Sequence, residues 1–315
     1  MKRAQAIGLL GAAASFGAAG ARASAADTVR FASIPIDGGA QAWYAQSLGF
    51  FQNAGISADI ASISNGSAIT AGVVGGTIDV GYSALLTLAA AHEKGVPISV
   101  IAPAGNYLKQ APISTLMVPV DSPAKTAKDL NGKTIAVNGI KNITQLATEA
   151  WSDQNGGDWK SLNFVEMGFP EMPAALAAHR VDAAFVTEPI VSSALRGGLA
   201  RNIGTPYDAI APVFTISAWF VTGAWSKANP ALVRRLSAVF RQASVWANTH
   251  DAESAQILSG ITKLPLAVVG GMTRSRFPET VTAKSLQPTI DSAARYGLLA
   301  KAFPAADLID PNAVQ

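Results

Sequence analysis

The sequence predicts an α/β protein with a largely parallel sheet. Short apolar runs typical of buried strands alternate along the chain with segments that repeat apolar residues at helical spacing. Glycines separate the two kinds of segment, as at Gly75, Gly76 and Gly95, because glycine accepts the left-handed conformation in which many helices end. The length of 315 residues favours two domains or one large one.

The first α/β series precedes residue 103. Strands are expected at residues 29–34, 56–63, 78–81 and 98–102, and helices at 40–48, 68–73 and 84–92. The centre of this series is the stretch 64–84, SNGSAITAGVVGGTIDVGYSA, in which a polar turn precedes a short helix. Tyr82 and Ser83 are expected to open the next helix. Two helix N-termini thus follow strand ends closely, and such N-termini suit small anions and polar ligands.

A second α/β series follows a polar interruption at residues 107–112. Strands are expected at residues 114–118, 134–137, 163–166 and 183–186, and helices at 125–130, 143–154, 173–179 and 189–195. Asn142 can cap the helix that begins at residue 143. Gln145 follows it at the spacing of a capping box, so we expect that motif here.

The remainder of the chain reads as largely helical after an extended apolar run at residues 213–221. Asn229 and Pro230 form a cap followed by proline at the first helical position. The helix that follows carries an apolar stripe of core residues, namely Leu232, Leu236, Val239, Phe240, Ala243, Trp246 and Ala247. Further helices are expected around residues 252–259, 266–271 and 283–296.

The first 25 residues have the features of a secretory signal peptide. Lys2 and Arg3 precede an uncharged run at residues 7–19, and small-x-small cleavage sites end at Ala23 and Ala25. The chain has no cysteine, which excludes a lipid-anchored lipoprotein, a disulfide framework and thiol catalysis. The net charge of +3 comes from Lys2, Arg3 and Arg22, so the mature chain is near neutrality and shows no basic stripe for nucleic acid.

Four segments together resemble the periplasmic substrate-binding proteins of ABC importers, in particular the nitrate/sulfonate/taurine-binding group and its thiamine-pyrimidine relatives. They are AQSLGFFQNAG at residues 45–55, GVVGGTIDVG at 72–81, DLNGKTIAV at 129–137 and RVDAAFVTEP at 180–189. Each pattern alone is weak, but their order after a signal peptide is fairly specific. The resemblance covers almost the whole mature chain.

The resemblance implies a two-lobed periplasmic-binding-protein fold of type II with two crossovers, near residues 110–113 and 210–215. Lobe 1 would comprise residues 26–111 and 214–315, and lobe 2 residues 112–213. Ligand would lie in the cleft between the lobes, at strand ends and helix N-termini, and closure of the lobes would sequester it. The partners implied are a small-molecule ligand and a membrane-embedded ABC permease, with the protein acting as a monomer in the periplasm.

Mapped onto this sequence, the family pattern gives candidate ligand contacts at strand-to-helix turns of both lobes. In lobe 1 they are Gln41, Trp43, Asn65, Gly66, Ser67, Tyr82, Ser83 and Trp219. In lobe 2 they are Asn138, Lys141, Asn142, Thr144, Thr187 and Glu188.

Several of these candidates have a second interpretation. Trp43 and Trp219 either stack on a ligand ring or fill the core. Asn142 and Thr144 are helix caps as well as candidate contacts, and Lys141 is either an anion partner or a solvated loop lysine. The taurine-type pattern places a carboxylate against the ligand amine, so Glu188 either has that role or is structural.

Three functions remain open on the sequence alone. The favoured one is a receptor for a small organic anion, a sulfonate or carboxylate with or without an aromatic ring. The second is a binder of a thiamine precursor or another heteroaromatic compound. The third is a secreted enzyme on the same scaffold, although the three histidines are isolated and no local catalytic, metal-ligating or cofactor-binding motif occurs.

Overall fold

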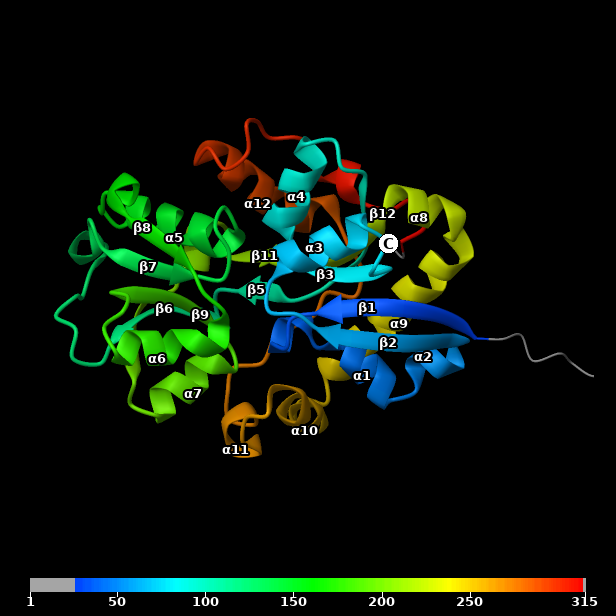
Figure 1. The fold of residues 1–315 in the computed structure, drawn as a ribbon, viewed down its shortest axis with the longest axis horizontal. Coiled ribbons are helices and arrows are strands. Elements are labelled where there is room, and N and C mark those ends of the chain that lie inside the picture. The colour runs from blue at the N-terminus through cyan, green and yellow to red at the C-terminus, as the bar shows by residue number, and fades with distance from the viewer. Residues whose placement is uncertain (1–25, 314–315) are drawn as a thin grey trace, which may run out of the picture.

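The computed structural model describes residues 26–313, and its helices and strands gather around two five-stranded sheets (Figure 1). The expected signal peptide lies outside the described residues. Both sheets are mixed, with one parallel part and one antiparallel part, so the largely parallel sheet expected from the sequence is only partly realised.

The first sheet contains, in spatial order, β2 (Ile56–Ser62), β1 (Asp27–Ser33), β3 (Val80–Ala84), β12 (Ser217–Thr222) and β4 (Ile98–Pro103). β1 runs parallel to β2 and β3, whereas β12 is antiparallel to both β3 and β4. β12 therefore returns the chain to the first sheet after the second sheet is complete.

The second sheet contains β10 (Ala200–Gly204), β6 (Ser114–Pro119), β9 (Ala183–Thr187), β7 (Thr134–Val137) and β8 (Asn163–Glu166). β7 is parallel to β8 and β9, and β6 is antiparallel to β9 and β10. A two-stranded ribbon of β5 (Asn106–Leu108) and β11 (Val213–Thr215) lies on the two segments that connect the sheets. β5 ends just before the first expected crossover at residues 110–113, and β11 falls within the second at residues 210–215. The residue boundaries of the two lobes remain a prediction.

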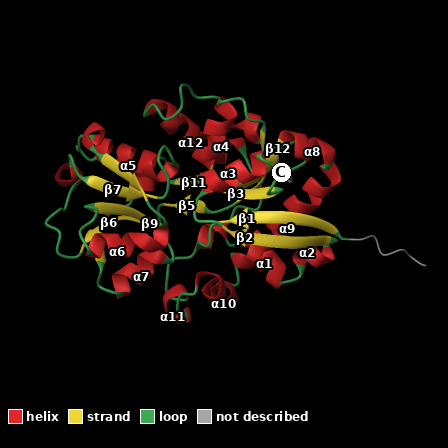
Figure 2. Ribbon diagram, viewed as in Figure 1, coloured by secondary structure: helices red, strands yellow, loops and turns green. Residues whose placement is uncertain are grey.

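Helices flank both sheets (Figure 2). Around the first sheet they are α1 (Gln41–Ser47), α2 (Phe50–Asn53), α3 (Gly66–Val74), α4 (Leu85–Glu93), α8 (Gly223–Ala228), α9 (Pro230–Ala247), α10 (Asp251–Thr262), α11 (Leu266–Val269) and α12 (Ala283–Arg295). Around the second sheet they are α5 (Ile143–Gln154), α6 (Met172–Ala177) and α7 (Ile190–Arg196). Short 3-10 helices are η1 (Asp37–Gly39), η2 (Ala127–Leu130), η3 (Trp159–Ser161), η4 (Phe169–Glu171), η5 (Pro206–Ala209) and η6 (Ala305–Leu308).

The helix α9 shows how the apolar pattern becomes core. Every residue of its expected stripe is buried except Trp246, which is half-buried. Phe240 lies inside the first lobe, where its ring stacks on Trp219 with 4.4 Å between centroids. Asn229 occupies the N-cap position but makes no capping bond, because its amide donates to the carbonyl of Trp225 instead. No helix of the described residues is both long and apolar enough to cross a membrane.

Candidate functional site

A pocket lies between the two sheets and takes residues from both. Its lining consists of Ile34, Ile36, Gly38, Gly66, Tyr82, Ala84, Gly105, Ile113, Ser114, Asn138, Asn142, Ile143, Thr144, Phe169, Thr187, Tyr207, Ile216 and Ser217. The free space inside is about 40 Å³, which has room for a few water molecules. A small ligand group fits this space, and a larger ligand requires the lobes to move apart.

The N-terminus of α3 forms one wall of the pocket. Asn65 is the N-cap, and its Oδ1 accepts a hydrogen bond from the Ala68 amide at 2.8 Å. Gly66, the first helical residue, lines the pocket, and its N–H is among those that an α-helix leaves without an internal partner. A Cβ at this position would lie 2.4 Å from Oγ of Ser83, so glycine lets the helix approach β3 closely. Oγ of Ser83 in turn donates to the Gly66 carbonyl at 3.3 Å.

The N-terminus of α5 forms the opposite wall. Asn142 is the N-cap, and its Oδ1 accepts from the Ile143 amide. Thr144 Oγ1 donates to Asn138 Oδ1 at 3.0 Å, and Asn138, Asn142 and Thr144 are all buried. The expected capping box is wrong, because Gln145 Oε1 accepts from the amide of Lys141 at 2.7 Å rather than from the amide of Asn142.

The pocket therefore lies between two helix N-termini that belong to different lobes. The aligned peptide dipoles of a helix give its N-terminus a partial positive charge, equivalent to roughly half an elementary charge. Among the described residues that line the pocket, no side chain is charged. The arrangement favours a small anion held by amide and hydroxyl donors.

Tyr82 adds a hydroxyl group to the lobe 1 side. Burial raises the pKa of Tyr82 to about 12, against the opposing effect of a hydrogen bond with Ser217. The phenol therefore keeps its proton at neutral pH and is able to donate a hydrogen bond. Tyr82 and Ser83 do not open a helix as expected, because β3 runs on to Ala84 alongside β12.

The remaining walls are apolar and aromatic. Phe169 and Tyr207 line the pocket from lobe 2, and Tyr207 also packs edge-on against Phe185 with 4.8 Å between ring centroids. No sequence signal marks Phe169 or Tyr207 as a site residue, and both lie in short 3-10 segments. Ser114 and Ser217 were not among the candidates either, although each begins a strand just after a crossover.

Six of the fourteen candidates line the pocket, namely Gly66, Tyr82, Asn138, Asn142, Thr144 and Thr187. Thr187 donates to the Ile113 carbonyl at 3.1 Å and accepts from Ser114 Oγ at 2.8 Å. Its hydroxyl thus ties β9 to the start of β6 at the pocket wall.

The other lobe 1 candidates lie around the pocket or in the core. Trp219 and Gln41 are fully buried in the core, and Trp43 is half-buried against the cluster that contains Tyr44. Ser83 lies behind Gly66, while Ser67 is exposed.

The other lobe 2 candidates also lie outside the lining. Lys141 is exposed and has a φ of 56°. Glu188 is buried, and its carboxylate accepts hydrogen bonds from the amide and the hydroxyl of Ser192. Burial raises the pKa of Glu188 above its ordinary value, and the hydrogen bonds from Ser192 offset only part of this rise. Its contacts are those of a helix cap for α7.

Contacts between the lobes border the cleft. Asn65 Nδ2 donates to Glu166 Oε1 at 3.4 Å. On α12 and α5, the Tyr296 hydroxyl donates to Asp153 Oδ2 at 2.8 Å, and the Tyr296 ring packs edge-on against Trp159. These contacts join segments that belong to different sides of the molecule, one around each five-stranded sheet.

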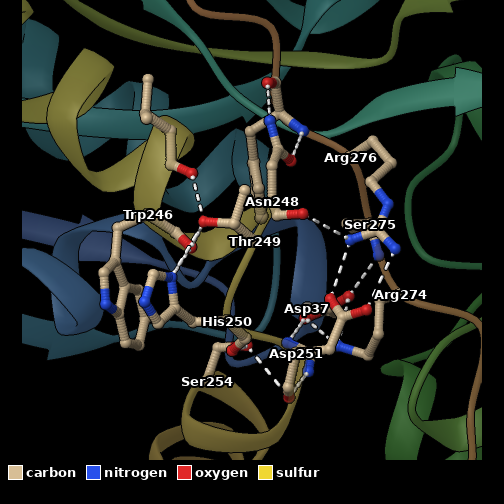
Figure 3. A network of polar contacts seen from close by, with 12 residues as sticks. Asp37, Trp246, Asn248, Thr249, His250, Asp251, Ser254, Arg274, Ser275 and Arg276 are labelled. Atoms are coloured by element: carbon tan, nitrogen blue, oxygen red, sulfur yellow. Dashed lines mark hydrogen bonds and ion pairs between the residues drawn. The ribbon is translucent and has the colours of Figure 1, made fainter.

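A buried ion pair fixes the loop that carries Gly38 into the pocket (Figure 3). Asp37 Oδ1 accepts from Arg274 Nη2 at 2.9 Å, and the two side chains are 1% and 7% exposed. Asp37 Oδ2 accepts from the amide of Ser275, and Arg274 Nη1 donates to the carbonyl of Asp251 at 2.7 Å. The segment after α11 is thereby tied to the loop after β1. No group of three or more His, Cys, Asp or Glu residues within 26–313 is placed to hold a metal ion.

A family model described as NMT1/THI5 like matches residues 40–254. The sequence has no match among curated proteins.

Solved structures share the fold over nearly their whole length. The alkanesulfonate-binding protein SsuA from Xanthomonas axonopodis pv. citri, bound to MOPS, has a TM-score of 0.75 and 19% identity, covering 91% of this chain and 99% of its own. The periplasmic nitrate-binding protein NrtA from Synechocystis PCC 6803 has a TM-score of 0.77 and 15% identity, covering 91% and 86%. The desulfurization enzyme DszB has a TM-score of 0.66 and 18% identity, covering 90% and 96%. These matches confirm the predicted two-lobed periplasmic-binding-protein fold.

Proposed function

Because the chain belongs to the NMT1/THI5-like family, we propose that it is the solute-binding component of an ABC importer, and that it binds a small organic monoanion. The ligand is a sulfonate or a carboxylate, with or without an aromatic ring. One observation carries the proposal: the N-termini of α3 and α5, from opposite lobes, face one pocket whose described lining has no charged side chain. Partial charges and neutral donors suit a monoanion, since none of the described lining residues is a fixed cation.

The names of two structural neighbours agree with this ligand class. One is an alkanesulfonate-binding protein with MOPS bound, and the other is a nitrate-binding protein. Both are anion binders, although their identity to this chain is low. The resemblance to the substrate-binding proteins of ABC importers supports a membrane-embedded permease as the partner of this chain, and the expected signal peptide supports a periplasmic location.

Lobe closure would supply the affinity in this proposal. The two pocket walls belong to lobes 1 and 2, so a ligand that bridges them favours the closed arrangement. Closure would also remove water from the anion, which strengthens its interaction with the helix N-termini. The lobes are proposed to be residues 26–111 with 214–315, and residues 112–213.

A second candidate is a heteroaromatic ligand such as a thiamine precursor. The aromatic rings of Tyr82, Phe169 and Tyr207 in the lining favour a flat ligand. An enzymatic role is the third candidate, because DszB shows that an enzyme has a similar fold. The described lining contains no histidine, carboxylate or lysine to act as an acid or base.

The proposal is tested by the thermal midpoint of the mature protein against a panel of sulfonates, carboxylates, nitrate and pyrimidines. A site saturated at about 100 times its dissociation constant stabilises the protein by about 2.7 kcal/mol, which shifts the midpoint measurably. We expect monoanions to raise the thermal midpoint of the wild type but not that of the Asn142→Leu variant. A rise with pyrimidines alone would favour the heteroaromatic binder, and a ligand recovered chemically altered would favour the enzyme.

A further inference from the structure

A buried carboxyl group lies on α5, on the helix whose N-terminus faces the pocket. Glu149 is 6% exposed, and its Oε1 accepts a hydrogen bond from Gln145 Nε2 at 2.8 Å. Its Oε2 is buried and has no hydrogen-bond partner among the described residues. Burial raises the pKa of Glu149, partly offset by the bond from Gln145. Ligand binding as proposed above does not require such a group, so its presence calls for another role.

Glu149 is the far end of a chain of hydrogen bonds that reaches the loop before α5. Because Gln145 Nε2 donates to Glu149, the amide of Gln145 is oriented with Oε1 toward the loop. That oxygen accepts from the backbone N–H of Lys141 at 2.7 Å. The three groups therefore form a relay from the buried carboxyl to the main chain of residue 141.

Lys141 is held in an unfavourable backbone conformation. Its φ of 56° lies in the left-handed region, which is sterically unfavourable for a residue other than glycine. Such a conformation persists when surrounding contacts fix it. The hydrogen bond that the Lys141 N–H donates to Gln145 Oε1 is a contact that fixes this conformation.

The loop that contains Lys141 is flanked on both sides by residues that line the pocket. Asn138 precedes it and Asn142 follows it, and both line the pocket. The turn is tight, since a Cβ added at Gly139 would lie 2.9 Å from Nδ2 of Asn142. A change in the backbone at Lys141 therefore moves the Asn142 side chain and the first turn of α5.

We propose that Glu149 is a positioning residue for the ligand site: acting through Gln145, it holds Lys141 in the left-handed conformation and so aims Asn142 and the N-terminus of α5 at the ligand. The effect on affinity rests on the proposed function. The effect on the loop does not rest on it, because the hydrogen bonds of the relay are present in the ligand-free protein.

The first measurement is the exchange rate of the Lys141 amide hydrogen, followed by NMR in the ligand-free protein. Glu149→Leu removes the acceptor at similar volume, whereas Glu149→Gln retains an oxygen for Gln145 Nε2. We expect exchange about tenfold faster in Glu149→Leu and a near wild-type rate in Glu149→Gln. Gln145→Met breaks the relay at its middle and is expected to match Glu149→Leu, which provides a second test if Glu149→Leu does not fold.

The matched control is Glu253→Gln, an exposed glutamate on α10, for which no change is expected. Equal exchange rates at Lys141 in wild type, Glu149→Leu and Gln145→Met would overturn the relay.

The second measurement is the dissociation constant of a monoanion that stabilises the wild type. The loss of one hydrogen bond in the relay is expected to raise this constant about fivefold in Glu149→Leu, with recovery in Glu149→Gln. An unchanged constant in Glu149→Leu, with wild-type binding intact, would overturn the role of Glu149 in affinity. Failure of the wild type to bind any monoanion would instead contradict the proposed function, and the exchange measurement would still decide the relay.

Discussion

The indole nitrogen of Trp219 donates a hydrogen bond to Oε1 of Gln41 at 2.7 Å in the core of the first lobe. Nε2 of the same glutamine donates to Ser244 Oγ at 2.8 Å, so the amide is fixed at both ends. The three residues lie on β12, α1 and α9, which are distant in the sequence. This buried polar contact joins β12 to the helices α1 and α9.

Trp219→Phe is expected to destabilise the protein with little effect on ligand affinity. The substitution keeps an aromatic ring but leaves Gln41 Oε1 buried without a donor, which costs about 1–3 kcal/mol. Denaturant unfolding measures the loss. Trp43→Phe, the same change at a half-buried site, serves as the control and should have a smaller effect. A large loss of affinity in Trp219→Phe at unchanged stability would contradict its placement in the core.

The Asp37–Arg274 pair is expected to matter more than any exposed ion pair of similar chemistry. Arg274→Met removes the partner of a carboxylate that is 1% exposed, and breaking a buried pair on one side destabilises by about 3–5 kcal/mol. Arg241→Met breaks the exposed pair with Glu279 and should lose about 1 kcal/mol or less. Equal losses in urea unfolding would contradict the structural role of the network in Figure 3.

We expect Asp310 to make the free energy of unfolding decrease as the pH falls into the acid range. Burial tends to raise the pKa of Asp310, but hydrogen bonds from Ser226, Ser99 and Asn312 outweigh it and leave the pKa below its ordinary value. The folded state thus releases this proton more readily than the unfolded state. The resulting stability is present above the unfolded pKa of about 3.9 and is lost as pH falls through the lower folded pKa.

Unfolding free energies between pH 7 and pH 3 measure this contribution. Asp310→Asn should be less stable than wild type at pH 7, and the gap should narrow on acidification. A gap that stays constant over this range would show that Asp310 does not titrate with the proposed linkage.

Gly66→Ala is expected to weaken both stability and ligand binding. The new Cβ would lie 2.4 Å from Ser83 Oγ, so either the Ser83 side chain or α3 must shift, and overpacking of this kind typically costs about 1–3 kcal/mol. Adding Ser83→Ala removes the clashing oxygen and should recover part of the loss. If the double variant were no more stable than Gly66→Ala and bound ligand no more tightly, the clash with Ser83 would not be the cause of the loss.

The alternation of strands and helices was predictable because it depends on local periodicity. The stripe of α9 and the breaks at Gly76 and Gly95 follow directly from residue type, since both glycines have positive φ. The N-termini of α3 and α5 were likewise predictable, because Asn65 and Asn142 are strong caps.

The errors arise where tertiary pairing overrides a local signal. β3 runs past Tyr82 because β12, far along the chain, continues beside it. For Trp219 the sequence left two interpretations open, and its contacts with Gln41 and Phe240 place it in the core. Tyr207 joins the pocket through the fold of lobe 2, and its neighbours in the sequence contain no signal for that contact.

We expect neutral donors at the two helix N-termini to bind a monoanion, and pairs of isosteric ligands test this binding mode. Benzenesulfonate and ethanesulfonate would each be compared by calorimetry with the corresponding neutral sulfonamide, and acetate with acetamide, at constant ionic strength. Heat and saturation are expected for at least one anion, and neither is expected for its neutral partner. Equal binding of an anion and its neutral isostere, or binding of the neutral member alone, would contradict this binding mode.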